Sequence, residues 1–168
     1  MTAIRKIIAG GQTGADRAGL DFALANQIPI GGWCPKGRRA EDGIVPSRYQ
    51  LKEHPASAYQ PRTIQNINES DLTVVFARSP LSPGSRFTLK QCWHQGKKHV
   101  WLAGFPDAEA DARCLRATLN QFDGILNIAG SRESKCPGIH EHVLRVLQLA
   151  TAEMTSVSNQ ESSRTESK

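Results

Sequence analysis

Runs rich in apolar and β-branched residues alternate along this chain with runs of helical period. Strands are predicted over residues 4–9, 28–30, 72–77, 99–103 and 125–129. Helices are predicted over residues 14–27, 61–70, 85–96, 107–122 and 138–153. The strand runs are mostly apolar throughout rather than alternating, which is typical of a sheet covered on both faces. The pattern therefore predicts a three-layer α/β fold with a mainly parallel sheet of about five strands.

Two segments depart from this alternation. Residues 31–60 form a connection much longer than the others, and long ordered connections in compact domains are usually functional. Residues 154–168 are rich in Ser, Thr and Glu and offer little apolar surface to bury. We therefore expect one ligand-binding domain over residues 1–153, followed by a disordered tail.

Length and composition agree with one globular domain. The chain has 168 residues, of which 39% are hydrophobic and 22% charged. No apolar run reaches the ~20 residues that a membrane-spanning helix needs. The N-terminus leads directly into the first predicted strand and leaves no room for a signal peptide. A cytoplasmic protein is expected.

Charge and cysteine content identify no partner by themselves. The net charge of +5 permits a polyanionic ligand. The basic residues are scattered, however, and no helix-turn-helix pattern is present, so nucleic acid is not an expected partner. The four cysteines contain no C-x-x-C pair, which argues against a zinc site and favours free thiols.

The stretch AGGQTGAD joins the first predicted strand to the first predicted helix. Gly10 and Gly11 can take positive φ and let a ligand approach the backbone. Thr13 and Asp16 have the spacing of a capping box, and free amides near Thr13 and Gly14 would favour a phosphate. The spacing fits neither a Walker A loop nor G-x-G-x-x-G. A tight turn without a ligand is the alternative.

The loop GGWCPKGRRAEDG, residues 31–43, follows the second predicted strand. Lys36, Arg38 and Arg39 could neutralise phosphates, and arginine can do so with two hydrogen bonds. Trp33 offers either a flat surface for a ring or a hydrophobic anchor for the loop. A solvated charge run is the alternative, but the position after a strand end favours a ligand site.

Four motifs in the same order closely resemble the molybdenum cofactor carrier family. They are GGQTGADRAGLDFA, GGWCPKGRRAEDG, YQPRTIQNINESD and LNIAGSRESKCPGI, and the resemblance covers residues 3–149. The family resembles a branch of a Rossmann-like superfamily that also holds cytokinin-activating phosphoribohydrolases and the DNA-processing protein A family. The resemblance implies a Rossmann-like domain, a phosphorylated, nucleotide-like ligand at the glycine turn, and a homo-oligomer, either dimer or tetramer.

The resemblance also implies a ligand site built from four segments. Carried over position by position, it comprises Gly11, Gln12, Thr13, Gly14 and Asp16; Trp33, Cys34, Lys36, Gly37, Arg38, Arg39, Glu41 and Asp42; Arg62, Thr63 and Asn66; and Gly84, Ser85 and Thr88. The chain has Pro83 where the family often has glycine, and Ser131 where it has proline. The phosphoribohydrolases place a catalytic glutamate where this chain has Lys90, which argues against nucleotide hydrolysis by their mechanism.

Three functions stay open at this level. The resemblance favours a non-catalytic carrier of the molybdenum cofactor, a pterin dithiolene with a terminal phosphate. The dithiolene belongs to the cofactor, so no metal ligands are required of the protein, and Cys34 is expected to be a buried structural thiol. An enzyme acting on phosphorylated nucleosides, with Asp16, Glu41 or Asp42 as acid or base, is the second function. A nucleotide sensor that shares the pocket without turnover is the third.

Overall fold

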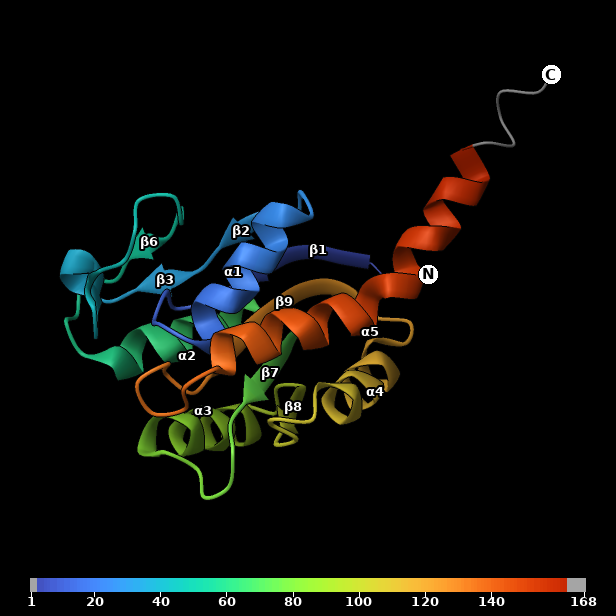
Figure 1. The fold of residues 1–168 in the computed structure, drawn as a ribbon. Helices are drawn as coiled ribbons and strands as arrows, with labels where there is room; N and C mark the ends of the chain where they lie inside the picture. The colour runs from blue at the N-terminus through green and yellow to red at the C-terminus, as the bar shows by residue number, and fades with distance from the viewer. Residues whose placement is uncertain (1–2, 163–168) are drawn as a thin grey trace.

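A computed structural model describes residues 3–162 of the chain (Figure 1). The main strands are β1 (Ala3–Ile8), β2 (Ile30–Gly31), β7 (Leu72–Phe76), β8 (His99–Leu102) and β9 (Asp123–Gly130). The helices are α1 (Ala15–Ala25), α2 (Tyr59–Glu69), α3 (Pro83–His94), α4 (Ala108–Leu119) and α5 (Ile139–Ser162). These elements overlap all ten predicted ones, so the alternation of strand and helix is confirmed.

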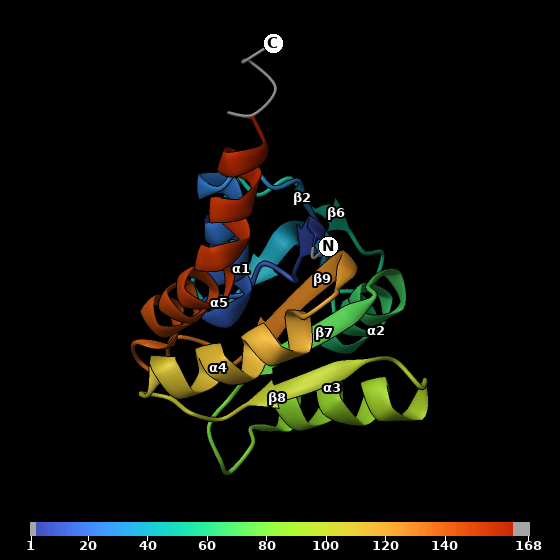
Figure 2. The ribbon, with the colours of Figure 1, turned by 90° about the vertical axis from the view of Figure 1, so that its right-hand side faces the viewer.

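The five main strands form one parallel sheet with the order β2-β1-β9-β7-β8. Helices cover both faces: α1, α4 and α5 lie on one side, and α2 and α3 on the other (Figure 2). The predicted three-layer, Rossmann-like α/β fold is therefore confirmed.

The strand order is a permuted form of a common arrangement. The last strand, β9, lies at the centre, between β1 and β7. If the strands are counted from β9 instead of β1, the order reads 3-2-1-4-5, as in doubly wound nucleotide-binding sheets. In such sheets, ligands bind where the loops after two neighbouring strands diverge, at the topological switch point. Here that point lies between β9 and β7.

The apolar runs form the core as their patterns predict. Every residue of β7 is buried, because helices cover both of its faces. The centre of β9 contributes Leu126 and Ile128, which pack with Phe22 of α1 and Leu147 of α5 in one cluster. Gly19 lets α1 approach β9 closely, since a Cβ on it would lie 2.6 Å from the Cβ of Ile128.

The long connection after β2 folds over the edge of the sheet. It contains β3 (Trp33–Cys34), a 3-10 helix (Lys36–Arg38), β4 (Arg39–Ala40), β5 (Gly43–Ile44) and β6 (Lys52–Glu53). A second apolar cluster beneath it consists of Ala9, Leu20, Cys34, Ala40, Val45 and Tyr49. The segment is therefore an ordered layer with a core of its own.

The guanidinium of Arg38 holds this layer together. It donates hydrogen bonds to the carbonyl oxygens of Val45, Pro46, Tyr49 and Leu51, at 2.9–3.3 Å. Backbone carbonyls in a loop need such partners when no strand pairs with them. Arg38 therefore supports the loop and is committed to its backbone.

Two predictions concern membrane-spanning helices and the C-terminal tail. Within residues 3–162, no helix is long and apolar enough to cross a membrane. α5 continues to Ser162, although the structure does not describe its side chains from residue 153 onward, and residues 163–168 lie outside the described range. The predicted domain boundary after residue 153 stays a prediction.

Replacing Arg38 by Ala should destabilise the fold, because four carbonyls would lose a charged donor at once. We expect the free energy of unfolding to fall by about 2 kcal/mol, within the range for charged hydrogen bonds. Urea unfolding monitored by circular dichroism measures this. Lys36→Ala, at an exposed position two residues earlier, should change stability by less than about 0.5 kcal/mol. Equal stability of the two variants would contradict this role of Arg38.

Candidate functional site

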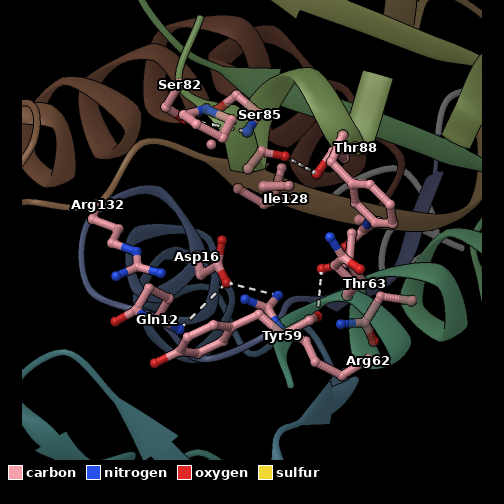
Figure 3. A pocket seen from close by; sticks show the side chains of 18 of the residues that line it. Gln12, Asp16, Tyr59, Arg62, Thr63, Ser82, Ser85, Thr88, Ile128 and Arg132 are labelled. Atoms are coloured by element: carbon pink, nitrogen blue, oxygen red, sulfur yellow. Dashed lines mark hydrogen bonds and ion pairs between the residues drawn. The ribbon is translucent and has the colours of Figure 1, made fainter. Parts of the chain in front are cut away.

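A cavity of about 600 Å³ opens at the carboxyl end of the central strands (Figure 3). Its walls come from the glycine turn after β1, the first turns of α2, the loop from β7 into α3, the end of β9 and the loop into α5. The loops after β9 and β7 flank it, so it lies at the topological switch point of the permuted sheet. This position makes it the candidate ligand site.

Nine of the residues predicted for the site line this cavity. They are Gln12, Asp16, Arg39, Arg62, Thr63, Asn66, Gly84, Ser85 and Thr88. They come from all four predicted segments, which the sheet brings together at one edge. The arrangement is cationic, since the charged lining residues are Asp16 against Arg39, Arg62, Arg132 and Lys135.

Several lining residues were not among the predicted ones, including Tyr59, Ser82, Asn127, Arg132 and Lys135. The sequence pattern could have indicated Arg132 and Lys135, because they lie in the loop that follows the last predicted strand. The carboxyl ends of parallel strands meet at one edge, so the loop after β9 had to lie near the loop after β7. The position of β9 beside β7 was the missing information.

The glycine turn differs from the predicted geometry. Gly14, not Thr13, is the N-cap of α1, and it has no side-chain cap, so the predicted capping box is wrong. The amide of Thr13 donates to Gln12 Oε1 at 3.1 Å, and the amide of Ala15 donates to the carbonyl of Ser131 at 3.1 Å. A phosphate at this helix end would have to replace such internal hydrogen bonds.

The two adjacent glycines of the turn have different reasons to be glycine. Gly11 has a φ of 80°, as expected, and packs against Val45 and Leu51 of the second cluster. Gly10 does not use the positive φ that a glycine can take. A Cβ on Gly10 would lie 1.7 Å from Nη1 of Arg62. Its missing side chain therefore makes room for a guanidinium.

Asp16 points into the cavity and is only 4% exposed (Figure 3). Its Oδ2 accepts a hydrogen bond from the amide of Gln12 at 3.3 Å and lies 3.4 Å from Nη1 of Arg62. Burial raises the pKa of this carboxyl above its usual range, although the positive charge of Arg62 opposes the shift. It is the one carboxylate among the lining residues.

Two buried donors near Asp16 have no partner among the residues that the structure describes. Gln12 Oε1 accepts from the amides of Thr13 and Glu41, which fixes the orientation of the side-chain amide. Its Nε2 is left buried without a partner, and so is Nε of Arg62. Buried donors without partners are rare and costly, so an ordered water or a ligand would have to supply the missing acceptor.

The first turn of α3 forms the opposite wall. Ser82 is the N-cap, and its hydroxyl oxygen accepts from the amide of Ser85 at 3.2 Å. Thr88 donates to the carbonyl of Gly84 at 3.0 Å, and a Cβ on Gly84 would meet no atom within 4 Å. The positive end of a twelve-residue helix thus meets the cavity, and Gly84 places no side chain there.

Trp33 and Asn66 connect the long loop to α2. Asn66 accepts from the amide of Trp33 at 2.8 Å and donates to its carbonyl at 3.1 Å, so its amide is already used. The indole of Trp33 donates to Glu69 at 2.8 Å, and Trp33 is not among the lining residues. Its role here is to anchor the loop.

The other predicted residues of this loop have separate locations. Cys34 is fully buried in the second cluster, and burial raises the pKa of its thiol. Lys36 and Gly37 are exposed outside the cavity lining. Within the described residues, no group of three or more His, Cys, Asp or Glu side chains could hold a metal ion. Of the three adjacent cations, only Arg39 reaches the cavity.

Glu41 and Asp42 tie the loop to neighbouring segments. Glu41 accepts hydrogen bonds from the hydroxyls of Thr13 and Ser134. Burial alone would raise the pKa of Glu41, but these hydrogen bonds hold it below its usual value. Asp42 forms a two-bond ion pair with Arg17 at 2.6 and 2.7 Å, which lowers the pKa of its carboxyl. Neither acid lines the cavity.

Comparisons with known proteins agree with this architecture. The crystal structure of a putative molybdenum carrier protein from Syntrophus aciditrophicus SB matches with a TM-score of 0.82 and 40% sequence identity. The match covers 89% of this chain and 96% of that one. A search of the curated proteins found no match.

The predicted family resemblance is confirmed by this neighbour and by a family comparison. The model of the circularly permutated YpsA SLOG family matches residues 7–151. A circular permutation is what the sheet itself displays, since its strand order becomes 3-2-1-4-5 when counted from β9. The chain belongs to the circularly permutated YpsA SLOG family.

Proposed function

We propose that this protein is a cytoplasmic carrier that binds the molybdenum cofactor, a phosphorylated pterin, in the switch-point cavity and does not convert it. One observation carries the proposal: buried donors of Gln12 and Arg62 lie without partners in the wall of a cationic cavity. In a binding protein without its ligand, hydrogen-bond donors that will contact the ligand are left without acceptors. The name of the solved neighbour, a molybdenum carrier protein, supports the choice of ligand.

The residues present fit a phosphorylated pterin. The N-terminus of α3 would take the phosphate, because the helix dipole favours an anion there and Gly84 leaves space; Pro83 has no N–H, and the phosphate would replace Ser82 as acceptor for the amide of Ser85. Gln12 Nε2 would donate to an acceptor on the pterin, and the Asp16 carboxylate would accept from its amino group. The cofactor would supply the dithiolene sulfurs for molybdenum, so no cluster of protein ligands is needed.

A nucleotide-processing enzyme is the second candidate, and Asp16 is the observation that favours it. A buried carboxyl with a raised pKa in a cavity is typical of a general acid or base. The glutamate of the phosphoribohydrolases, by contrast, has no counterpart here, since Lys90 is exposed on α3. Asp16 would therefore have to act without a second lining carboxylate.

Protein purified anaerobically from its native host should carry a phosphorylated pterin. Native mass spectrometry of the intact protein, followed by analysis of the released small molecules, identifies it. Oxidised pterin fluorescence in the released fraction provides an independent reading. Release of a nucleotide with no pterin would contradict the carrier proposal and favour the enzyme or sensor.

Replacing Gly84 by Asp should remove the ligand and leave the fold intact. The position is open, and an acid in the first turn stabilises a helix. The new carboxylate would repel a phosphate at the same helix end, so the bound fraction after purification should fall about tenfold or more. Native mass spectrometry measures that fraction.

Gly84→Asn is the matched control, because Asn has the shape of Asp without its charge. We expect this variant to retain most of the ligand. An equal loss in both variants would mean that the added side chain blocks the cavity, whatever its charge. Full retention in both would place the phosphate elsewhere.

Asp16→Asn separates the two functions. If the protein is a carrier, the wild type should bind molybdopterin without converting it. Incubation with nucleoside monophosphates and diphosphates should likewise yield no product. Chromatography of the incubated ligands measures turnover. Sustained product release that Asp16→Asn abolishes at nearly unchanged affinity would establish the enzyme instead, because such a group acts only in the transition state.

A further inference from the structure

The ring of Tyr59 is surrounded by three guanidinium groups. The Cζ atoms of Arg132, Arg39 and Arg62 lie 4.9, 5.0 and 5.9 Å from its centre. Three separate segments supply them: β4, α2 and the loop after β9. We call these four residues the tyrosine–arginine cluster. Figure 3 shows Tyr59, Arg62 and Arg132 across the cavity from Ser82 and Ser85 at the start of α3.

The positive charge of this cluster is largely uncompensated. Arg62 faces Asp16 at 3.4 Å. Within the described part of the chain, no carboxylate lies within 4 Å of the guanidinium of Arg39 or Arg132. Glu41 acts on Arg132 from farther away, but its oxygens already accept hydrogen bonds from Thr13 and Ser134. Like charges held together repel, and a bound anion would relieve that repulsion.

The same wall contains the two buried donors without partners. Gln12 is 6% exposed, and its Nε2 is unmatched, as is Nε of Arg62. A guanidinium that is attracted to the face of a tyrosine ring keeps N–H groups with which it can bind a phosphate through two hydrogen bonds. Arg39 makes one further contact, to the carbonyl of Ser57 at 3.1 Å. The cluster thus combines cation–π contacts to one ring with N–H donors that an anion could use.

We propose that the tyrosine–arginine cluster is a second anion subsite, and that the ligand carries at least two phosphoryl groups. This inference rests on the proposed binding role and adds the charge of the ligand to it. The N-terminus of α3 takes one group, and Arg39 and Arg132 take the other, on opposite walls of the cavity. For the carrier, the ligand would then be a diphosphate ester or bisphosphate of the pterin, with one phosphoryl group more than the single phosphate placed at α3 above.

Pyrophosphate is a direct probe of the second subsite. Isothermal titration should show that it binds the wild type and that the double variant Arg39→Gln, Arg132→Gln binds it about tenfold more weakly or worse. Affinity should also fall more steeply with salt in the wild type than in the variant, because charges have been removed. A role of the arginines in packing alone would not change the salt dependence.

Arg113→Gln is the matched control, since this exposed arginine of α4 is not among the lining residues. It should bind pyrophosphate within about twofold of the wild type. Thermal unfolding verifies that the double variant folds; if it does not, Arg39→Gln alone is used, because Arg39 is exposed. Wild-type affinity for pyrophosphate in the folded variant would overturn the inference.

The two proposals fail in different ways. If the native ligand is a monophosphate whose binding depends on Gly84 but not on Arg39 and Arg132, the second subsite is wrong and the carrier role stands. If pyrophosphate binding depends on the two arginines but no pterin is found in the anaerobically purified protein, the subsite stands and the carrier role is wrong.

Discussion

The structure depends on the parallel pairing of β9 with both β1 and β7. The sheet consists of two halves, β2–β1 and β7–β8, and only β9 joins them. The loops that leave β9 and β7 diverge at this junction, and the space between them is the cavity. Because β9 comes late in the sequence, the walls meet only when most of the chain is in place. Such long-range pairing is entropically expensive and slow to form.

The sequence was sufficient for the elements and the layers, because apolar runs and helical periodicity report burial directly. It was not sufficient for strand order, since a buried strand such as β7 has the same pattern wherever it lies in the sheet. The glycines and the free amides expected at the start of the first helix made the turn after β1 the expected phosphate site. The permuted order instead places the loops after β9 and β7 at the switch point. Arg132 was missed for this reason, whereas Tyr59 was missed because the second helix was expected to begin at residue 61.

Adjacent residues in the long loop show a second limit of sequence reasoning. Arg38 and Arg39 are chemically identical neighbours, yet one bonds to loop carbonyls and the other lines the cavity. The backbone decides between them, because Gly37 and Arg38 both have positive φ and the chain then extends at Arg39. A charge pattern carries no information about that turn. The proposed ligand site consequently has fewer residues from this loop than its cations suggest.

The contact between Gly10 and Arg62 ties one small residue to the electrostatics of the whole cavity. Any side chain at position 10 would displace the guanidinium that lies 3.4 Å from Asp16. Asp16 would then keep its burial but lose the nearest positive charge, and its carboxyl would favour the protonated form still more. A single methyl group at position 10 would thereby raise the pKa of an acid in the ligand cavity further. Gly10 thus influences the acid strength of Asp16 through the position of the Arg62 guanidinium. The backbone conformation of Gly10 alone would not reveal this role.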